Sequence, residues 1–362
     1  MVDLENDTHT SPITEAILSW YHQSRRDLPW RRSNDPYKIW LSEIILQQTR
    51  VDQGTPYYYK FIERFPSIHD MAKASEDEIM LLWQGLGYYA RARNMHRAAK
   101  LISKDWATFP SNYAAIRALP GVGDYTSAAV ASIAFNLPHA AIDGNVNRVI
   151  SRIWGLSQAV DSAEGKTIIT QLSNELLDRT QPGAYNQAMM ELGALCCTPR
   201  NPNCAVCPVA SWCYALKHKR QTDFPIKKKA KEAQVRHFNF LIFIDGEGNT
   251  LLEKRNNHDI WKGLYQFPLI ESAVESYRLD IPSKGQLVKV YDGINHKLSH
   301  RLLKVKFWHV QFEGDFPKNL IADKRIAFTD WSIFAMPRAI TRFLEKNGPS
   351  IMLTIESHKG YK

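Results

Sequence analysis

The sequence predicts an all-α domain over residues 1–216, a basic linker over residues 217–235 and a smaller α+β domain over residues 236–362. A chain of 362 residues is long enough for two domains, each with a sizeable core. Up to about residue 216 apolar residues recur at intervals of three and four, and beyond about residue 236 the period changes to two. Between these parts lies KHKRQTDFPIKKKAKEAQ, a lysine-rich segment that either tracks phosphates or is a solvated connector.

Helix start signals support the assignment of the N-terminal part. The apolar repeat is clearest in four segments: Ile13–Tyr21, Tyr37–Leu46, Glu78–Trp83 and Ser127–Phe135. Asp35 followed by Pro36 offers an N-cap and a first-turn proline, and Pro110 with Ser111 predicts a similar helix start. Short turns that contain Gly and Pro separate the segments, as in an all-helical domain.

The C-terminal part has the pattern of strands. FNFLIFI ends at the turn Asp245–Gly248, and TLLEKR, QLVKVYD and LLKVKFWHV alternate or run apolar. These runs predict the strands of the α+β domain.

Composition limits the class of protein. The chain is 44% hydrophobic and 23% charged, and its apolar stretches are too short for a transmembrane helix. The N-terminal residues MVDLENDTHTSP lack the basic and then apolar order of a secretory signal, so we expect a cytoplasmic protein. Lys and Arg number 46 against 37 Asp and Glu. This surplus suggests a polyanionic partner such as nucleic acid, although a lysine-rich surface would give the same balance.

Four of the five cysteines have the spacing of metal ligands. Cys197, Cys204, Cys207 and Cys213 form C-x6-C-x2-C-x5-C. Soft thiolates confined to one short segment suit zinc or an iron–sulfur cluster, and coordination chemistry alone hardly separates the two. Zinc sites more often carry two C-x-x-C pairs and only one is present, which favours a [4Fe–4S] cluster. Cys196 falls outside the pattern, and we expect it to be a small buried residue.

The motif LPGVGDYT precedes an apolar helical segment. Gly121 and Gly123 flank a valine at a helix N-terminus, where backbone N–H groups can point outward together and bind a phosphate. This arrangement is typical of a helix-hairpin-helix. A plain turn between two helices is the alternative.

Two acidic residues are candidates for acid–base chemistry. Glu43 in KIWLSEIILQQTRV is surrounded in sequence by apolar residues, and partial desolvation would favour its neutral, proton-donating form. The alternative is that Glu43 faces solvent. Asp143 in AIDGNVNRV stands at a predicted helix start, where it could simply act as an N-cap.

Taken together, the motifs resemble a known family. SEIILQQTRV, GLGYYARARN, LPGVGDYTSAAVASIAF, DGNVNRV and the cysteine run occur in the order found in the helix-hairpin-helix glycosylases of the endonuclease III superfamily. More narrowly, the chain resembles MutY-type adenine DNA glycosylases over nearly its whole length. The resemblance implies a monomeric bacterial-type enzyme of base excision repair. Its partner would be double-stranded DNA with adenine mispaired with 8-oxoguanine or guanine.

The resemblance also implies roles for the two carboxylates and their neighbours. Glu43 would protonate the adenine, and Asp143 would stabilise positive charge on the sugar. Members with lyase activity carry a lysine where this chain has Tyr125. A phenol cannot form a Schiff base, so we expect a monofunctional glycosylase in which Tyr125 and Asn145 position Asp143 and the sugar. The alternatives are a bifunctional glycosylase of the endonuclease III type and a mismatch-binding protein without catalysis.

Further contacts follow from the same resemblance. The residues expected to enclose adenine are Leu28, Trp30, Arg31, Leu46 and Gln187. The residues expected to contact the opposite base and its neighbours are Gln48, Thr49, Leu86 and Tyr88.

The C-terminal domain is similar to a MutT-like, or Nudix, fold, in which WKGLYQFP resembles a strand and turn. A Nudix hydrolase needs a glutamate-rich helix to hold magnesium, and no such run follows Pro268, so we do not expect nucleotide hydrolysis. Relatives carry Phe-Ser-His at the tip of a hairpin that reads the oxidised guanine. Here the tip is Leu298, Ser299 and His300, which keeps the hydrogen-bonding groups and lacks the aromatic ring.

Overall fold

The computed structural model describes residues 10–106, 108–228, 232–256, 259–298, 300–320 and 322–359. The chain divides by its contacts into two units. The first unit contains residues 1–73 and 97–229, and the second contains residues 74–96 and 230–362. The helical domain expected over residues 1–216 therefore contains one segment, 74–96, that groups with the C-terminal residues.

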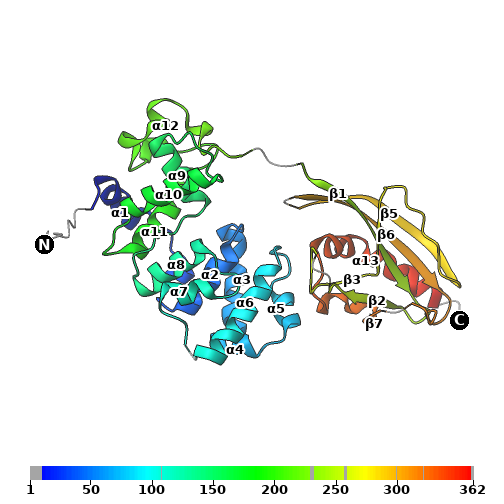
Figure 1. Cartoon of the computed structure of the whole chain (residues 1–362). Helices are drawn as coiled ribbons and strands as arrows, with labels where there is room; N and C mark the ends of the chain where they lie inside the picture. The colour runs from blue at the N-terminus through cyan, green and yellow to red at the C-terminus, as the bar shows by residue number, and fades with distance from the viewer. Residues whose placement is uncertain are drawn as a thin grey trace. The chain divides into compact units, whose positions relative to one another are not determined.

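The N-terminal two thirds of the chain are helical (Figure 1). The α-helices are α1 (Pro12–Ser24), α2 (Pro36–Leu46), α3 (Val51–Arg64), α4 (Ile68–Lys73), α5 (Glu76–Leu82), α6 (Ala90–Leu101), α7 (Tyr113–Ala118), α8 (Asp124–Phe135), α9 (Gly144–Trp154), α10 (Ala163–Leu176), α11 (Pro182–Glu191) and α12 (Tyr214–Lys217). Shorter 3-10 and π turns are η1 (Pro29–Arg31), η2 (Ile102–Trp106), η3 (Leu192–Cys196), η4 (Cys204–Val206), η5 (Ala210–Trp212) and η6 (Gln221–Asp223).

Local capping explains where several helices begin. The Asp35 side chain accepts a hydrogen bond from the Tyr37 N–H at 2.9 Å, as the Asp35–Pro36 signal predicts. The predicted helix start at Pro110 and Ser111 is wrong by a short distance. Helix α7 begins at Tyr113, because Asn112 is the cap and its side chain accepts from the Ala115 N–H.

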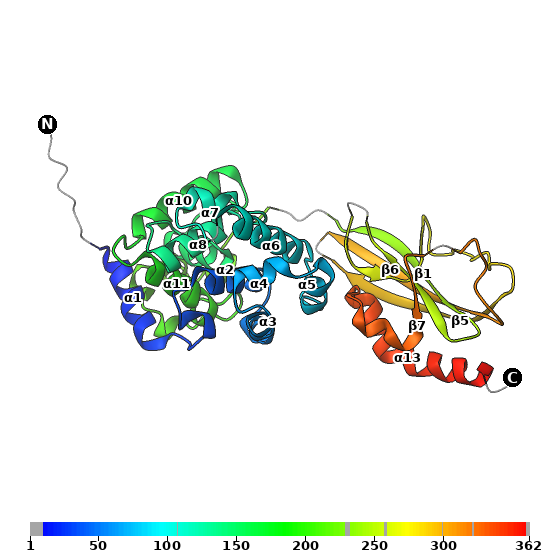
Figure 2. The ribbon, with the colours of Figure 1, turned by 90° about the horizontal axis from the view of Figure 1, so that it is seen from below.

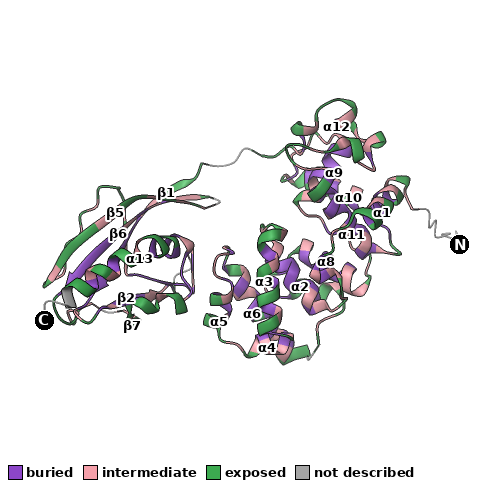
Figure 3. Ribbon diagram, turned by 180° about the vertical axis from the view of Figure 1, so that it is seen from behind, coloured by how far each residue is buried: buried purple, intermediate pink, exposed green. Residues whose placement is uncertain are grey.

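Burial explains how the first unit is packed (Figure 3). Apolar side chains of α1, α9, α10 and α11 form one core cluster. Helix α2 is buried along most of its length, from Tyr37 to Ile45. Helices α8 and α11 approach closely at Gly183, where a Cβ atom would lie 2.7 Å from the Ser132 carbonyl oxygen. These contacts bring α2, α8, α9 and α11 around one space.

The C-terminal residues form a seven-stranded mixed sheet among the described residues. Its strands are β1 (Gln234–Ile244), β2 (Asn249–Lys254), β3 (Tyr265–Gln266), β4 (Leu269–Ser272), β5 (Gly285–Lys297), β6 (Arg301–Phe312) and β7 (Lys324–Ala327). The order is β3-β2-β1-β6-β5, with β4 paired to β1 and β7 to β2. Strands β1 and β6 pair in parallel, and the other pairs are antiparallel.

Helix α13 (Arg338–Lys359) lies along one face of the sheet (Figures 1 and 2). The Phe343 ring stacks on Phe307 of β6 with ring centroids 3.8 Å apart. The 3-10 turn η7 (Phe328–Ile333) precedes this helix. Sheet and helix together confirm the predicted α+β class. None of the described helices is long and apolar enough to span a bilayer.

Candidate active site

One cavity in the first unit holds both predicted carboxylates. Its volume is about 160 Å³. Glu43 comes from α2 and Asp143 from the residue before α9, and the other walls come from η1, α8 and α11. Residues remote in sequence therefore meet at one space that a small planar group could enter.

Glu43 lies on the buried helix α2 and is only 7% exposed. Its Oε2 accepts a hydrogen bond from the Tyr125 hydroxyl at 2.5 Å. Burial disfavours the charged carboxylate and raises the pKa of Glu43 to about 7. The hydrogen bond from Tyr125 acts against this rise, while the charge of Asp143 adds to it. Near neutral pH Glu43 is therefore able both to hold and to release a proton.

Asp143 caps α9. Its Oδ1 accepts from the N–H groups of Asn145 and Val146, both at 2.8 Å, and its Oδ2 accepts from Asn145 Nδ2 at 2.8 Å. Burial raises the pKa of Asp143, and these hydrogen bonds and the charge of Arg148 oppose the rise. The partial positive charge at the helix N-terminus also favours the ionised form. Asp143 is thus a helix cap that also faces the cavity.

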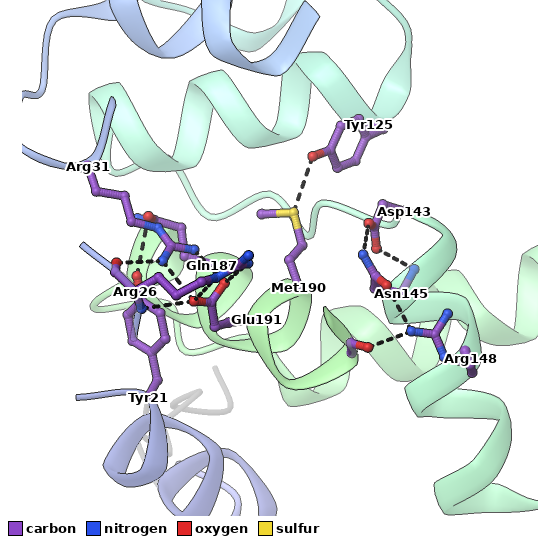
Figure 4. A network of polar contacts seen from close by, with 11 residues as sticks. Tyr21, Arg26, Arg31, Tyr125, Asp143, Asn145, Arg148, Gln187, Met190 and Glu191 are labelled. Atoms are coloured by element: carbon purple, nitrogen blue, oxygen red, sulfur yellow. Dashed lines mark hydrogen bonds and ion pairs between the residues drawn. The ribbon is translucent and has the colours of Figure 1, made fainter. Parts of the chain in front are cut away.

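The neighbours predicted to position Asp143 lie at the same cavity (Figure 4). The Tyr125 oxygen lies between Glu43 and Met190, at 3.2 Å from the Met190 sulfur. Asn145 Oδ1 accepts from Arg148 Nη2 at 2.8 Å. Gly193 allows η3 to approach this point, because a Cβ there would lie 2.5 Å from the Asn145 Cβ.

The residues predicted to enclose a base all line the cavity: Leu28, Trp30, Arg31, Leu46 and Gln187. Thr49 lines it as well. Gln48 is not among the described residues that line the cavity. Its backbone is in the left-handed region, with φ at 57°. A non-glycine residue there is strained, a feature that clusters at functional sites.

Two charged residues of the cavity were missed by sequence reasoning. Glu191 is 1% exposed, and its carboxylate binds Arg26 Nη2 at 2.6 Å and Arg31 Nη2 at 3.0 Å (Figure 4). Burial by itself would raise the pKa of Glu191, but the arginine hydrogen bonds outweigh it and lower the pKa to about 2. Arg26 and Glu191 are 165 residues apart, so no local pattern could reveal the pair.

Comparison with known proteins decides the family. Residues 41–177 match the HhH-GPD superfamily base excision DNA repair protein, residues 197–213 the iron-sulfur binding domain of endonuclease III, and residues 239–346 the NUDIX domain. The adenine DNA glycosylase of Buchnera aphidicola subsp. Schizaphis graminum is 34% identical over 298 residues, which are 81% of this chain and 86% of that protein.

The chain belongs to the adenine DNA glycosylase family. The adenine DNA glycosylase of Homo sapiens is 40% identical over 220 residues, which are 57% of this chain and 40% of that protein. Among solved structures, a thermostable thymine-DNA glycosylase aligns with a TM-score of 0.53 at 31% identity, over 57% of this chain and 95% of its own. The family suggested by the motifs and the two predicted folds are confirmed.

The four predicted cysteine ligands line one cavity, with Val149 and Ile153 of α9 on its apolar wall. Arg152 Nη1 lies 3.2 Å from the Cys197 sulfur and would neutralise thiolate charge. The family's iron–sulfur domain falls on these residues, which confirms a [4Fe–4S] cofactor over zinc.

Helix α9 joins the two sites. Arg148 Nε donates to the Cys197 carbonyl at 2.7 Å, while its Nη2 donates to Asn145 Oδ1 and to the Gly193 carbonyl. When bound, the cluster would brace the segment that starts at Cys197. Cys196 is 3% exposed and its thiol donates to the Asn203 carbonyl at 3.1 Å, so it is buried as predicted.

The predicted hairpin turn has the geometry of an anion site. Gly121 has φ at 77°, and Gly123 is the N-cap of α8. A Cβ on Gly123 would meet nothing within 4 Å, so the backbone there is open to a large ligand. Arg117 donates to the Val122 carbonyl at 2.9 Å and fixes the turn. This is the arrangement in which helix N–H groups receive a phosphate.

The remaining predicted contacts belong to the second unit. Tyr88 is 50% exposed and has φ at 46°, and it follows Gly85 and Gly87, which also have positive φ. Leu86 is 6% exposed. At the tip between β5 and β6, His300 is exposed, and Ser299 lies outside the described residues.

Proposed function

We propose that this protein hydrolyses the N-glycosidic bond of adenine in duplex DNA. One observation carries the proposal: a carboxyl with a pKa near 7 and a second, hydrogen-bonded carboxyl line the same cavity. Adenine leaves the sugar poorly as an anion. A proton from Glu43 to N7 lets the bonding pair of the C1′–N9 bond leave with a neutral base. Asp143 would oppose the positive charge at C1′ until water adds there.

The absence of a lysine at position 125 supports hydrolysis without strand cleavage. Tyr125 instead donates a hydrogen bond to Glu43, which holds the acid in place and limits the rise of its pKa. Asn145 holds Asp143 in turn. With no amine in this place, we expect water rather than the protein to capture the sugar carbon.

We further propose that the opposite base is 8-oxoguanine or guanine. The adenine must be rotated out of the duplex to reach the cavity, while the opposite base stays in the duplex. The hairpin turn at Gly121–Gly123 and the lysine-rich residues 217–235 supply phosphate contacts. The β5–β6 tip with Ser299 and His300 would read the opposite base. We expect the enzyme to act as a monomer in the compartment that holds the genome.

A single-turnover assay tests the proposal. Duplexes with adenine opposite 8-oxoguanine, guanine or thymine are incubated with excess protein, and released adenine and strand breaks trapped by borohydride are measured separately. We expect adenine release opposite the first two bases and no trapped strand break. Glu43→Gln should slow release by at least about 100-fold. Glu175→Gln, which changes an exposed glutamate of α10, is the matched control.

Two results would contradict the proposal. Failure of the wild-type protein to release adenine from any of the three duplexes would remove the enzymatic function. Release that Glu43→Gln leaves intact would show that the acid lies elsewhere.

A further inference from the structure

The loop between β2 and β3 contains the WKG motif, Trp261–Gly263, and contacts the residues on both sides of the β5–β6 tip. We call its described residues 259–264 the WKG loop. The loop is closed by hydrogen bonds from the Arg255 N–H to the Leu264 carbonyl at 2.9 Å and from the Gly263 N–H to the Arg255 carbonyl at 2.7 Å. Trp261 has φ at 62° and Gly263 has φ at 80°. A tryptophan in this region is strained, so its conformation is imposed by its surroundings.

Asp259 in this loop is surrounded by three guanidinium groups. Its Oδ1 lies 2.6 Å from Arg301 Nη1, and its Oδ2 lies 2.7 Å from Arg236 Nη1 and 3.4 Å from Arg255 Nη2. Arg236 also pairs with Glu271, and Arg255 also donates to Gln266 Oε1. Among the described residues, the ion-pair partner of Arg301 is Asp259.

The loop contacts both arms of the tip. Arg301 is the first residue of β6, and its carbonyl accepts from the Leu298 N–H at 2.8 Å, which closes the turn. On the other arm, the His296 ring lies against Trp261 with centroids 5.7 Å apart. The His300 carbonyl accepts from the Gln234 N–H of β1 at 3.1 Å. The WKG loop and β1 together therefore hold the described residues on both sides of the turn.

Partial burial strengthens the ion pairs around Asp259. The Asp259 side chain is 24% exposed and that of Arg236 14%, so the pair is partly desolvated and worth more than a surface pair. The tip itself is polar and exposed at Lys297 and His300. Holding such a turn in one conformation contributes little to the fold. It does reduce the entropy that an exposed turn loses when it binds a ligand.

We infer that Asp259 is a positioning residue for recognition of the base opposite adenine, acting through Arg301 on the turn between β5 and β6. The inference rests on the proposed function of that turn. It gives the WKG motif a role that requires no magnesium and no nucleotide hydrolysis. The ligand is an oxidised purine in duplex DNA, and Asp259 does not touch it.

Two full-length variants with opposite effects on charge test the inference. Asp259→Asn adds one positive charge, and Arg301→Gln removes one, while both break the same ion pair. The dissociation constant is measured for duplexes that carry a non-cleavable 2′-fluoro adenosine analogue opposite 8-oxoguanine or guanine. The dissociation constant for the guanine duplex divided by that for the 8-oxoguanine duplex is the ratio that measures discrimination. Glu275→Gln, which breaks the pair of Glu275 with Lys304 on β6, is the control.

We expect both variants to reduce the ratio about fivefold to tenfold, the effect of losing one hydrogen bond of typical net strength. Binding to undamaged DNA should strengthen in Asp259→Asn and weaken in Arg301→Gln, because the non-specific affinity for DNA depends on the charge of the protein. In both variants, hydrogen exchange should rise in the peptide that spans residues 294–303. Glu275→Gln should leave the ratio unchanged.

The outcomes separate this inference from the proposed function. A double variant, Ser299→Ala with His300→Ala, tests the tip itself. If this double variant lowers the ratio while Asp259→Asn and Arg301→Gln do not, the positioning role is overturned and the proposed reading of the opposite base stands. If the double alanine variant leaves the ratio unchanged, the proposed reading by the tip fails. Equal weakening on both duplexes by the ion-pair variants also overturns the inference.

Discussion

Glu43 is held between two opposing influences on its pKa. Burial within α2 raises the pKa to about 7, and the hydrogen bond from Tyr125 lowers it. A more exposed carboxyl would be ionised at neutral pH and could not donate a proton. A carboxyl without the tyrosine would retain its proton too strongly. The residue thus has the pKa that a general acid needs near neutral pH.

The pH dependence of the single-turnover rate should follow Glu43. We expect the rate to fall as the pH rises above about 7, because the acid loses its proton there. Tyr125→Phe removes the hydrogen bond that favours the ionised form, so the alkaline limb should move to higher pH. Rates measured from pH 5 to pH 9 with saturating enzyme check this. A limb that stays in place, or moves to lower pH, would contradict the assignment.

Glu191 should matter for stability as well as for the cavity. Glu191→Gln leaves Arg26 and Arg31 without their carboxylate, and we expect the free energy of unfolding at pH 7 to fall by about 3 kcal/mol. The native pKa is about 2, below the ordinary carboxyl value. The stabilisation is therefore present above that ordinary value and is lost as the pH falls toward 2. Urea unfolding measures it, and Glu175→Gln should change the free energy by less than about 0.5 kcal/mol.

At the scale of elements, α9 connects the cavity that holds Glu43 and Asp143 to the cysteine segment. Asp143 caps the helix, Asn145 lies in its first turn, and Arg148 and Arg152 follow at helical spacing. Arg148 reaches Asn145 on one side and the Cys197 carbonyl on the other. A single helix therefore places the Asp143 carboxylate relative to the first cysteine of the cluster segment.

Arg148→Lys should uncouple these two ends. A lysine retains the positive charge but cannot donate in the forked geometry that reaches Asn145, Gly193 and Cys197. We expect the single-turnover rate to fall by up to about 100-fold through misplacement of Asp143. Visible absorbance and iron content should fall less than the rate does. A rate equal to that of the wild type would show that Arg148 serves only the fold.

At the scale of the whole chain, the two units differ in how their cores are built. The first unit buries helices around an apolar core, and its cysteine segment has only short 3-10 turns among the residues described. The second unit buries a mixed sheet against α13. Local unfolding of the cysteine segment would therefore leave most helical hydrogen bonds intact.

Removal of iron by oxidation and a chelator tests this difference. We expect the visible absorbance to disappear and the affinity for duplex DNA to fall at least about tenfold, because Arg200, an exposed basic residue of this segment, would lose its fixed position. Far-UV circular dichroism should change little, since the segment 197–213 contributes few helical residues. A large loss of helical signal would show instead that the cluster supports the entire first unit.

Several features could be predicted from residues close together in the chain. The Asp35 cap, the four cysteines and the glycines of the hairpin turn act through neighbours within a few positions, so their geometry is local. The helix start near residue 110 was displaced, because Asn112 competes successfully as the cap. The order of motifs was specific enough to indicate the family.

Contacts across the fold could not be predicted in this way. Tyr125 meets Glu43 across 82 positions, and the carboxylate of Glu191 finds its arginines across more than 150. The parallel pairing of β1 with β6 and the support of the β5–β6 tip by Asp259 are equally remote in the chain. Periodicity reports which face of an element is apolar. Which charged groups share a desolvated space, and so what their pKa values become, depends on how the elements pack.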